Sequence, residues 1–353
     1  MQHTKHFPAL DGLRGIAAFC VFLGHLELGK YLHPPHFELA VDFFFLLSGF
    51  VVAHAYEEKL KCGMSFSTFA QIRLVRLYPL ILLGLSVGAI ILSTRALLGH
   101  DLSFILRGSL AWLLALVMIP TPLLEYTVGE AAFPFNVPSW SLSAELISNA
   151  FYALFVRHLT DRVLAFVVAG SAILVLIFGV DGGPTFSTTH IGFVRVMFSF
   201  PAGIALYRLF RMGWLEYFKA PFLVIVALLL VTFCLPRGQL SWLVDDVSVL
   251  VTFPVIVAAG ANIPMSGARK RISLFLGQLS YPLYILHHPL IKPFANVTRV
   301  YQLTGSLFVC WTVLEIVTIV SFSLAAMKFY DEPLRKILSR QLLRRDDQVV
   351  HAS

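Results

Sequence analysis

Charged side chains are scarce in this sequence of 353 residues, in which Asp, Glu, Lys and Arg together make up only 13%. Soluble domains carry roughly 25% of these residues. Hydrophobic residues account for 58% of the chain, and its mean hydropathy is +0.79. A chain this apolar cannot cover the surface of a soluble domain with polar groups. The composition therefore excludes a soluble globular protein and predicts a bilayer environment.

Cysteine is also rare, and the four cysteines are too far apart for a metal site or a disulfide framework. We interpret them as packing residues; they are Cys20, Cys62, Cys234 and Cys310. The sequence also lacks internal repeats, low-complexity tracts and a soluble appendage. We therefore expect a single domain over residues 1–353, with a core from about 8 to 336 and a short basic cytoplasmic tail at 337–353.

Acidic residues are outnumbered by basic ones, 20 to 27, which gives a formal net charge of +7. Such an excess can indicate nucleic-acid binding. In a membrane protein, however, Lys and Arg concentrate in cytoplasmic loops, and this explains the excess without any nucleic acid. We therefore expect no nucleic-acid partner.

The N-terminal region contains an apolar stretch, Ile16–Leu28, that follows Lys5 and has to be distinguished from a cleaved signal peptide. Asp11 and Arg14 interrupt the approach to this stretch, and His25 lies inside it. We therefore expect a retained first transmembrane helix.

Long hydrophobic runs are abundant, and a membrane-spanning helix needs about 20 mostly apolar residues. Ten runs fit this requirement: Leu10–Leu32, Phe37–Ala55, Leu74–Thr94, Ser139–Phe155, Val163–Val180, Phe193–Phe210, Pro221–Leu235, Leu243–Asn262, Leu274–Phe294 and Gly305–Phe329. An eleventh run, Leu102–Ile119, is divided by Arg107, which leaves only about a dozen apolar residues after it, short for a span.

The basic residues decide between ten and eleven spans, because Lys and Arg favour cytoplasmic loops. With Lys5 in the cytoplasm and ten spans, all later basic clusters fall inside: Lys59/Lys61, Arg73/Arg76, Arg208/Arg211/Lys219, Arg269/Lys270/Arg271 and Arg335/Lys336/Arg340/Arg344/Arg345. If Leu102–Ile119 also spanned, the clusters from Arg208 to Arg271 would lie outside. The sequence therefore predicts an all-α polytopic membrane protein with about ten transmembrane helices and both termini cytoplasmic. Residues 95–138 then form a long outer loop that is partly re-entrant.

Ionisable residues inside spans cost several kcal/mol and are therefore functional candidates. Arg14 and His25 are eleven residues apart in the first predicted span. In a helix this spacing returns to within about 20° of the same face after a rise of about 16 Å. One helix face is therefore expected to carry a cation near the cytoplasmic surface and an imidazole in the outer half. A snorkelling Arg and a buried, hydrogen-bonded His remain the structural alternative.

Asp42, Glu145 and His287 are predicted to share the depth of His25, because each lies a similar number of residues from the outer end of its own span. An imidazole beside a carboxylate is the arrangement that general base catalysis on a hydroxyl requires. The same groups would serve a proton relay in a transporter equally well. Depth alone leaves both functions open.

Arg73 and Arg76 are three residues apart at the start of the third predicted span and therefore share a helix face. Arg14 enters the membrane at the same level. Three arginines at one cytoplasmic mouth suit a phosphate-bearing ligand, because guanidinium groups bind phosphate through paired hydrogen bonds. Ordinary cytoplasmic enrichment of Arg is the alternative explanation.

Six motifs occur in order along the chain: LDGLRGIAAFCVFLGH, VDFFFLLSGFVVA, RLVRLYP, PSWSLSAELISNAFY, LSYPLYILHHP and YDEPLRK. Together they closely resemble the membrane acyltransferase-3 family of bacterial O-acyltransferases, which modify polysaccharides and other extracytoplasmic acceptors. The resemblance extends from Leu10 to Lys336. It implies ten spans with cytoplasmic ends. Many members also carry an eleventh helix and a periplasmic hydrolase-like domain, and this sequence resembles the stand-alone form without them.

The resemblance assigns the family's motif residues to particular positions of this sequence. The Arg and His of the first helix fall on Arg14 and His25, and the paired arginines fall on Arg73 and Arg76. The Trp-Ser-Leu…Glu motif falls on Trp140, Ser141 and Glu145. The Tyr…His-x-Pro element falls on Tyr281, His287 and Pro289, and the closing Glu-Pro falls on Glu332 and Pro333. It implies transfer of an acyl group, acetyl by preference, from cytoplasmic acyl-CoA to a hydroxyl of an extracytoplasmic carbohydrate or lipid-linked glycan.

Residues and resemblance together define the expected site. His25 is the catalytic base, with Glu145 or Asp42 fixing its tautomer. Arg14, Arg73 and Arg76 bind the phosphates of acyl-CoA, which is a donor substrate; no tightly bound cofactor and no metal is expected. The expected substrate contacts are Trp140, Ser141, Tyr281 and His287. We expect a multi-pass protein of the bacterial inner membrane, surrounded by lipid; a transporter or proton-coupled carrier without transferase activity is the alternative.

Overall fold

A computed structural model describes residues 6–27, 33–99, 103–125 and 129–352. Its regular elements are helices, apart from one isolated bridge between Ala131 and Thr185 within the described residues. The helices are α1 (Pro8–His25), α2 (Ala40–Lys61), α3 (Phe66–Leu98), α4 (Ser103–Leu116), α6 (Ser139–Phe155), α7 (Asp161–Phe178), α8 (Thr189–Arg211), α9 (Phe222–Cys234), α10 (Ser241–Val247), α11 (Phe253–Ala261), α12 (Gly267–Val300), α13 (Gly305–Ala325) and α14 (Glu332–Ala352). The all-α prediction is confirmed.

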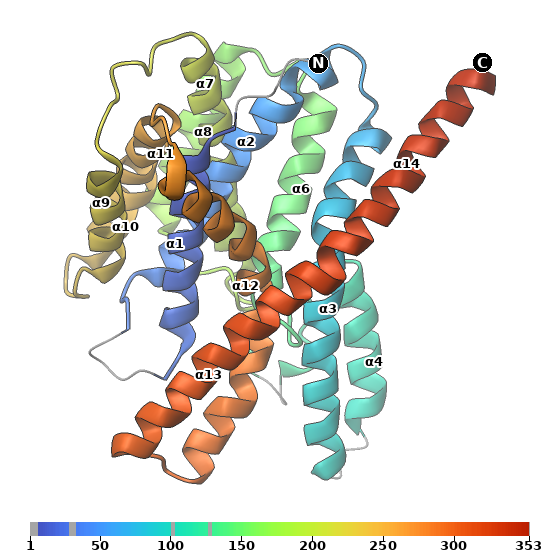
Figure 1. The fold of residues 1–353 in the computed structure, drawn as a ribbon, viewed down its shortest axis with the longest axis vertical. Coiled ribbons are helices and arrows are strands. Elements are labelled where there is room, and N and C mark those ends of the chain that lie inside the picture. Colours follow the sequence, from blue (N-terminus) through green and yellow to red (C-terminus); the bar gives the residue numbers. More distant parts are fainter. Residues whose placement is uncertain (1–5, 28–32, 100–102, 126–128, 353) are drawn as a thin grey trace.

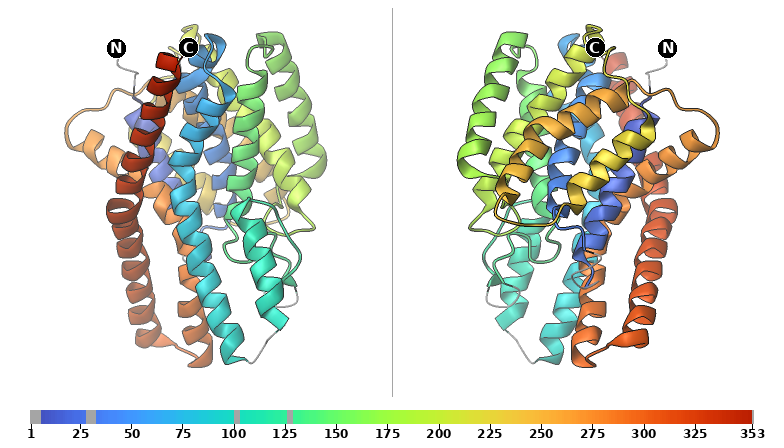
Figure 2. Two further views of the ribbon diagram at one scale, coloured as in Figure 1. Left: turned by 90° about the vertical axis from the view of Figure 1, so that its right-hand side faces the viewer. Right: turned by 90° about the vertical axis from the view of Figure 1, so that its left-hand side faces the viewer.

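The helices run roughly along one axis and form a bundle with two distinct ends (Figure 1). At one end α2 and α8 finish with basic last turns, which contain Lys59, Lys61, Arg208 and Arg211. We call this the basic end; α14 also points towards it. At the opposite end α3, α4, α12 and α13 extend beyond the other helices (Figure 2). Fewer helices therefore make up this end than the basic end.

Six described helices are long and apolar enough to cross a membrane: Phe37–Lys61, Phe66–Leu98, Asp161–Phe178, Thr189–Arg211, Ser241–Ala261 and Gly305–Leu342. The helices at the other four predicted spans, α1, α6, α9 and α12, do not meet these criteria. Helix α9 is only 13 residues long and α6 only 17. Helices α1 and α12 carry the buried polar groups described below. The count of ten spans stays a prediction.

Helix α4 covers most of the doubtful run Leu102–Ile119 and does not traverse the bundle. It begins beside the far end of α3 and stops part of the way along it (Figure 2). There the hydroxyl of Tyr78, well inside α3, donates a hydrogen bond to the Leu116 carbonyl at 2.7 Å. The chain then turns back, and Asn136 donates to the Ile285 carbonyl in the middle of α12 at 2.8 Å. The segment around Asn136 therefore lies inside the bundle.

The close packing of α1 on α12 positions the functional side chains. A Cβ added to Gly15 would lie 2.5 Å from the Cβ of Leu276, and one added to Gly277 would lie 2.6 Å from the Cβ of Asp11. Only glycine permits this approach, because larger residues would separate the helices. Arg14 consequently reaches the backbone of α12, and His25 reaches His287 on the same helix.

Some sequence-based predictions lie outside the described part of the chain. They are the orientation marker Lys5, the end of the first predicted span at residues 28–32, Leu102 at the start of the doubtful run, and the side chains of Arg344 and Arg345.

The arrangement of the two ends leads to a labelling prediction. Glu130 accepts a hydrogen bond from Ser187 at 3.1 Å, in the loop that joins α7 and α8 on the side of these helices away from the basic end, whereas Lys270 is exposed at the start of α12. A cysteine replacing Glu130 should react with a membrane-impermeant maleimide in intact cells, and one replacing Lys270 only after permeabilisation. The four native cysteines are first replaced by serine. Protection of position 130 in intact cells would contradict this topology.

Candidate active site

A cavity of about 1060 Å³ lies between α1, α2, α3, α6, α12 and α14. It reaches the surface at the basic end, where the exposed side chains of His6 and Arg340 line it. Six of the side chains that line it are Arg or Lys: Arg14, Arg73, Arg76, Arg335, Lys336 and Arg340. Four are Asp or Glu: Asp11, Glu145, Asp331 and Glu332. The cavity therefore favours an anionic ligand.

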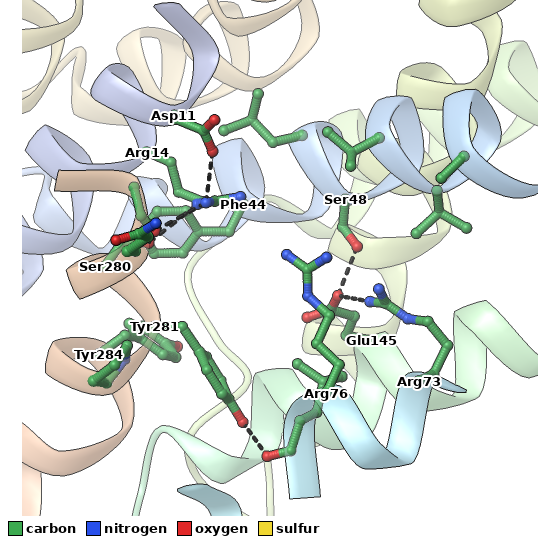
Figure 3. A pocket seen from close by; sticks show the side chains of 18 of the residues that line it. Asp11, Arg14, Phe44, Ser48, Arg73, Arg76, Glu145, Ser280, Tyr281 and Tyr284 are labelled. Carbon is green, nitrogen blue, oxygen red and sulfur yellow. Dashed lines mark hydrogen bonds and ion pairs between the residues drawn. The ribbon is translucent and has the colours of Figure 1, made fainter. Parts of the chain in front are cut away.

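Arg14 is held against α12 by contacts on three sides. Its Nε donates to the hydroxyl of Ser280 at 3.0 Å, and one terminal nitrogen donates to the Gly277 carbonyl at 2.9 Å and to Asp11 at 2.7 Å. Figure 3 shows Asp11 and Ser280 beside the guanidinium group. The side chain is therefore fixed in orientation before any ligand arrives.

Glu145 lies in this cavity beside the arginines of α3, not beside His25. Its Oε1 accepts hydrogen bonds from Arg73 at 2.9 Å and from Ser48 at 2.6 Å. Arg76 points towards the same carboxylate in Figure 3, but it forms no ion pair among the described residues. The predicted meeting of Arg14, Arg73 and Arg76 at one cavity agrees with this geometry, whereas the predicted contact between Glu145 and His25 is wrong.

The start of α6 explains the misplacement of Glu145. The prediction measured its depth from Ser139, which was taken as the outer end of a span. In the structure Ser139 is fully buried, because Asn136 just before it is bonded to the middle of α12 and α6 therefore begins inside the bundle. Figure 1 shows α6 starting well short of the far ends of α3 and α12. Glu145, six residues further along, consequently reaches the arginines near the basic end.

Two tyrosines of α12 line the deep part of the cavity. The hydroxyl of Tyr281 donates to the Leu77 carbonyl at 2.6 Å. Tyr284 and Ser141 join their hydroxyl groups at 2.8 Å, and Ser141 donates its own proton to the Pro138 carbonyl at 2.9 Å. Both predicted contact residues, Ser141 and Tyr281, therefore line the cavity. Both hydrogen bonds of the Ser141 hydroxyl are to protein groups, so its role here is structural and it is not free to act as a nucleophile.

A pair of histidines lies beyond Tyr284. The ring of Tyr284 is 6.1 Å from that of His287, and the rings of His287 and His25 are 4.9 Å apart. His25, at the end of α1, is partly exposed, whereas His287 is fully buried. The His287 ring is enclosed by protein, so within this pair His25 is the one accessible to a substrate. The substrate contact of His287 stays a prediction.

The hydrogen bonds of the two rings define their tautomers when both are neutral. A carbonyl oxygen only accepts, so a ring nitrogen bonded to it must carry the proton. Nδ1 of His287 lies 3.0 Å from the Leu283 carbonyl and therefore donates, which leaves its Nε2 as an acceptor. Nδ1 of His25 lies 3.3 Å from that Nε2 and 2.9 Å from the Val21 carbonyl. His25 therefore keeps its proton on Nδ1 and presents an unprotonated Nε2.

Asp42 is engaged elsewhere, at the beginning of α2. Both of its oxygens accept from Arg195 of α8, with the closest contact at 2.5 Å, and both side chains are almost entirely buried. Arg195 also donates to the Gly182 and Glu38 carbonyls. The predicted role of Asp42 as the partner of His25 is wrong, because Arg195 occupies its carboxylate.

Trp140 lies in the same buried region, away from the cavity. The Arg195 guanidinium lies 5.4 Å from its ring, and a Cβ added to Gly183 or Gly192 would fall within 2.7 Å of that ring. Only 8% of Trp140 is exposed. The indole packs against α8 and the loop before it, outside the cavity lining, and its substrate contact stays a prediction.

The sequence analysis missed Arg195, the partner of Asp42, and a second buried pair. In this second pair Nδ1 of His36 lies 2.5 Å from Oδ1 of Asp245. Arg195 had a visible signal, because a charge inside the predicted span Phe193–Phe210 requires a buried partner. The signal for His36 was weaker, since it precedes a predicted span. Both pairs fasten the segment around Phe37, whose ring packs 4.8 Å from that of His25.

Comparison with known proteins identifies the family of the chain. The family model described as an acyltransferase domain matches residues 7–328. Protein 2 in the picA locus of Rhizobium radiobacter is 37% identical over 182 residues, which cover 49% of this chain and 94% of that protein. Acyltransferase MdmB of Streptomyces mycarofaciens is 29% identical over 326 residues, which cover 81% and 79% respectively. No solved structure matches the chain. The chain therefore belongs to the acyltransferase-3 family and is an integral membrane acyltransferase.

Proposed function

We propose that this acyltransferase moves an acyl group, acetyl by preference, from acyl-CoA in the arginine-lined cavity to a hydroxyl of an extracytoplasmic glycan or glycoconjugate. The observation that carries the proposal is the single cavity that gathers Arg14, Arg73 and Arg76 and ends at Tyr284, next to the histidine pair. Membership of an acyltransferase family supports the reaction class.

The donor's diphosphate would bind among Arg14, Arg73 and Arg76. Arg76 has no ion-pair partner among the described side chains and is exposed to the cavity, so it is available to a phosphate oxygen. Charge-assisted hydrogen bonds of this type are short and strong. The flexible arm of the donor would then run along α1 for the rise of about 16 Å between Arg14 and His25, which brings the thioester towards the histidines.

His25 supplies the acid–base chemistry through its unprotonated Nε2. This nitrogen takes the proton of the acceptor hydroxyl while the hydroxyl oxygen attacks the thioester carbonyl. The carbon–sulfur bond then breaks, and the protonated imidazole returns the proton to the departing thiolate of CoA. His287 acts as a positioning residue, because it accepts the Nδ1 proton of His25 and holds the ring in the productive tautomer.

The proposal places the basic end in the cytoplasm and the opposite end outside, as expected if Lys and Arg remain on the cytoplasmic side. The donor cavity opens at the basic end, where cytoplasmic acyl-CoA is available. The partly exposed His25 lies towards the opposite end, where an extracytoplasmic acceptor can approach. The membrane is then the inner membrane of a bacterium, crossed by about ten helices.

Kinetics with a simple donor tests the proposal. Purified protein should hydrolyse acetyl-CoA slowly or transfer its acetyl group to a glycan acceptor. Replacing Arg76 with alanine should raise KM for acetyl-CoA about tenfold, as expected for one lost charge-assisted contact, and should change kcat little. Lys270→Ala, which removes an exposed cation outside the cavity, is the matched control. Transport of a solute without any turnover of acetyl-CoA would favour the carrier alternative.

A further inference from the structure

Helix α14 presents one face to the donor cavity. The residues of α14 that line the cavity are Glu332, Arg335, Lys336, Ser339 and Arg340. Their spacing of three and four residues places all of them on the same side of a helix. We call these five residues the cavity face of α14.

The cavity face extends from the interior to the surface. Asp331, which directly precedes the cavity face, is buried; within the face Arg335 is partly exposed, and Lys336 and Arg340 are exposed. A π-helical turn, Ala326–Asp331, joins α13 to α14. Such turns occur frequently at functional sites. Because Lys336 and Arg340 are exposed and line the cavity, the outer part of the cavity face forms one wall of the cavity mouth.

Internal ion pairs use three of the six cavity cations. Asp11 pairs with Arg14, Glu145 with Arg73, and Asp331 with Arg335 at 3.2 Å. These pairs account for three of the four cavity acids. Among the described side chains, Arg76, Lys336 and Arg340 belong to no such pair. Lys336 and Arg340 are one helical turn apart, so the mouth carries two adjacent cations with no internal partner.

We propose that Lys336 and Arg340 bind the 3′-phosphate on the nucleotide of the acyl-CoA donor. This inference rests on the proposed function, in which the acyl end of the donor must reach Tyr284 at the deep end of the cavity and His25 beyond it. The adenosine end must then lie at the mouth. A phosphate monoester carries close to two negative charges near neutral pH, and two neighbouring cations match it. Arg14, Arg73 and Arg76 remain for the diphosphate.

A lipid phosphate is the other source of the same chemistry, since basic helices at a membrane surface attract anionic headgroups. The position of Lys336 and Arg340 on the wall of the donor cavity favours the nucleotide. Binding measurements in membranes of different charge separate the two sources.

The experiment compares the affinity of the full-length protein for CoA and for 3′-dephospho-CoA in nanodiscs of zwitterionic lipid. Wild-type protein should bind CoA about tenfold more tightly than 3′-dephospho-CoA, as expected when charge-assisted contacts to one phosphate are lost. The double variant Lys336→Gln/Arg340→Gln should bind CoA about tenfold more weakly than wild type and 3′-dephospho-CoA with unchanged affinity. Arg76→Ala should weaken both ligands equally.

Lys328→Gln is the matched control, because Lys328 is an exposed cation on the same continuous helix that does not line the cavity. It should keep the preference for CoA, and melting temperatures should show that all variants are folded. Equal weakening of both ligands in the double variant, or an unchanged preference, would overturn the proposal. So would a loss confined to nanodiscs with anionic lipid, which would identify a lipid site. Wild-type binding of both ligands with equal affinity overturns this inference alone, whereas binding of neither overturns the proposed function as well.

Discussion

Replacing His25 with alanine is expected to abolish acyl transfer while the protein still inserts and accumulates. The substitution removes the only partly exposed imidazole of the histidine pair, and with it the unprotonated Nε2 that accepts the hydroxyl proton. General base catalysis contributes about 10²- to 10⁴-fold to a rate, so residual transfer should fall below the background of most assays. The measurement is acetyl transfer from acetyl-CoA by purified protein, with the amount of folded protein determined in parallel.

His288→Ala is the matched control for this variant. The ring of His288 lies 5.7 Å from that of His25, but the two share no hydrogen bond among those formed by the described residues. We expect His288→Ala to retain most of the transfer activity. Near-normal transfer by His25→Ala, or an equal loss in both variants, would rule out His25 as the specific base.

The second large effect is expected on stability and not on chemistry. Replacing Arg195 with glutamine should lower the free energy of unfolding by about 3–5 kcal/mol, because the fully buried Asp42 then keeps a charge without its partner. The same substitution weakens the contacts of Arg195 with the Gly182 and Glu38 carbonyls and with the Trp140 ring. Thermal unfolding in detergent measures the change.

The exposed pair of Arg237 with Glu38, 3.7 Å apart, provides the control. Arg237→Gln also removes one arginine from an ion pair near the same loop, yet it should cost less than about 1 kcal/mol because water screens exposed pairs. If Arg195→Gln and Asp42→Asn unfold normally but lack transfer activity, Asp42 belongs to the catalytic machinery after all. Its catalytic role, expected from the sequence, would then replace the purely structural one.

The helical segments of the fold could be predicted from sequence because the bilayer imposes a simple requirement. A span needs a long apolar run, and every predicted run overlaps a helix or a continuous pair of helices such as α10 and α11. The charge distribution favoured ten spans without Leu102–Ile119, and α4 stops beside Tyr78, but the number of spans stays a prediction. Hydropathy could not show that the segment around Asn136 lies inside the bundle, because this depends on a partner distant in the sequence, the Ile285 carbonyl.

The sequence by itself determined which groups share a helix face. The spacing of Arg14 and His25 on α1, and of Arg73 and Arg76 on α3, follows from the fixed geometry of one helix. Both pairs therefore kept their predicted relation in the folded protein.

The tertiary structure alone decided which groups meet across helices. Glu145 pairs with Arg73, Asp42 with Arg195, and His25 with His287. These partners depend on where each helix starts along the bundle axis and on how it is rotated about its own axis. Both are set by side-chain packing between helices, as at Gly15 against Leu276. The pattern of charged and apolar residues along the sequence indicates neither the axial position nor the rotation of a helix in the bundle.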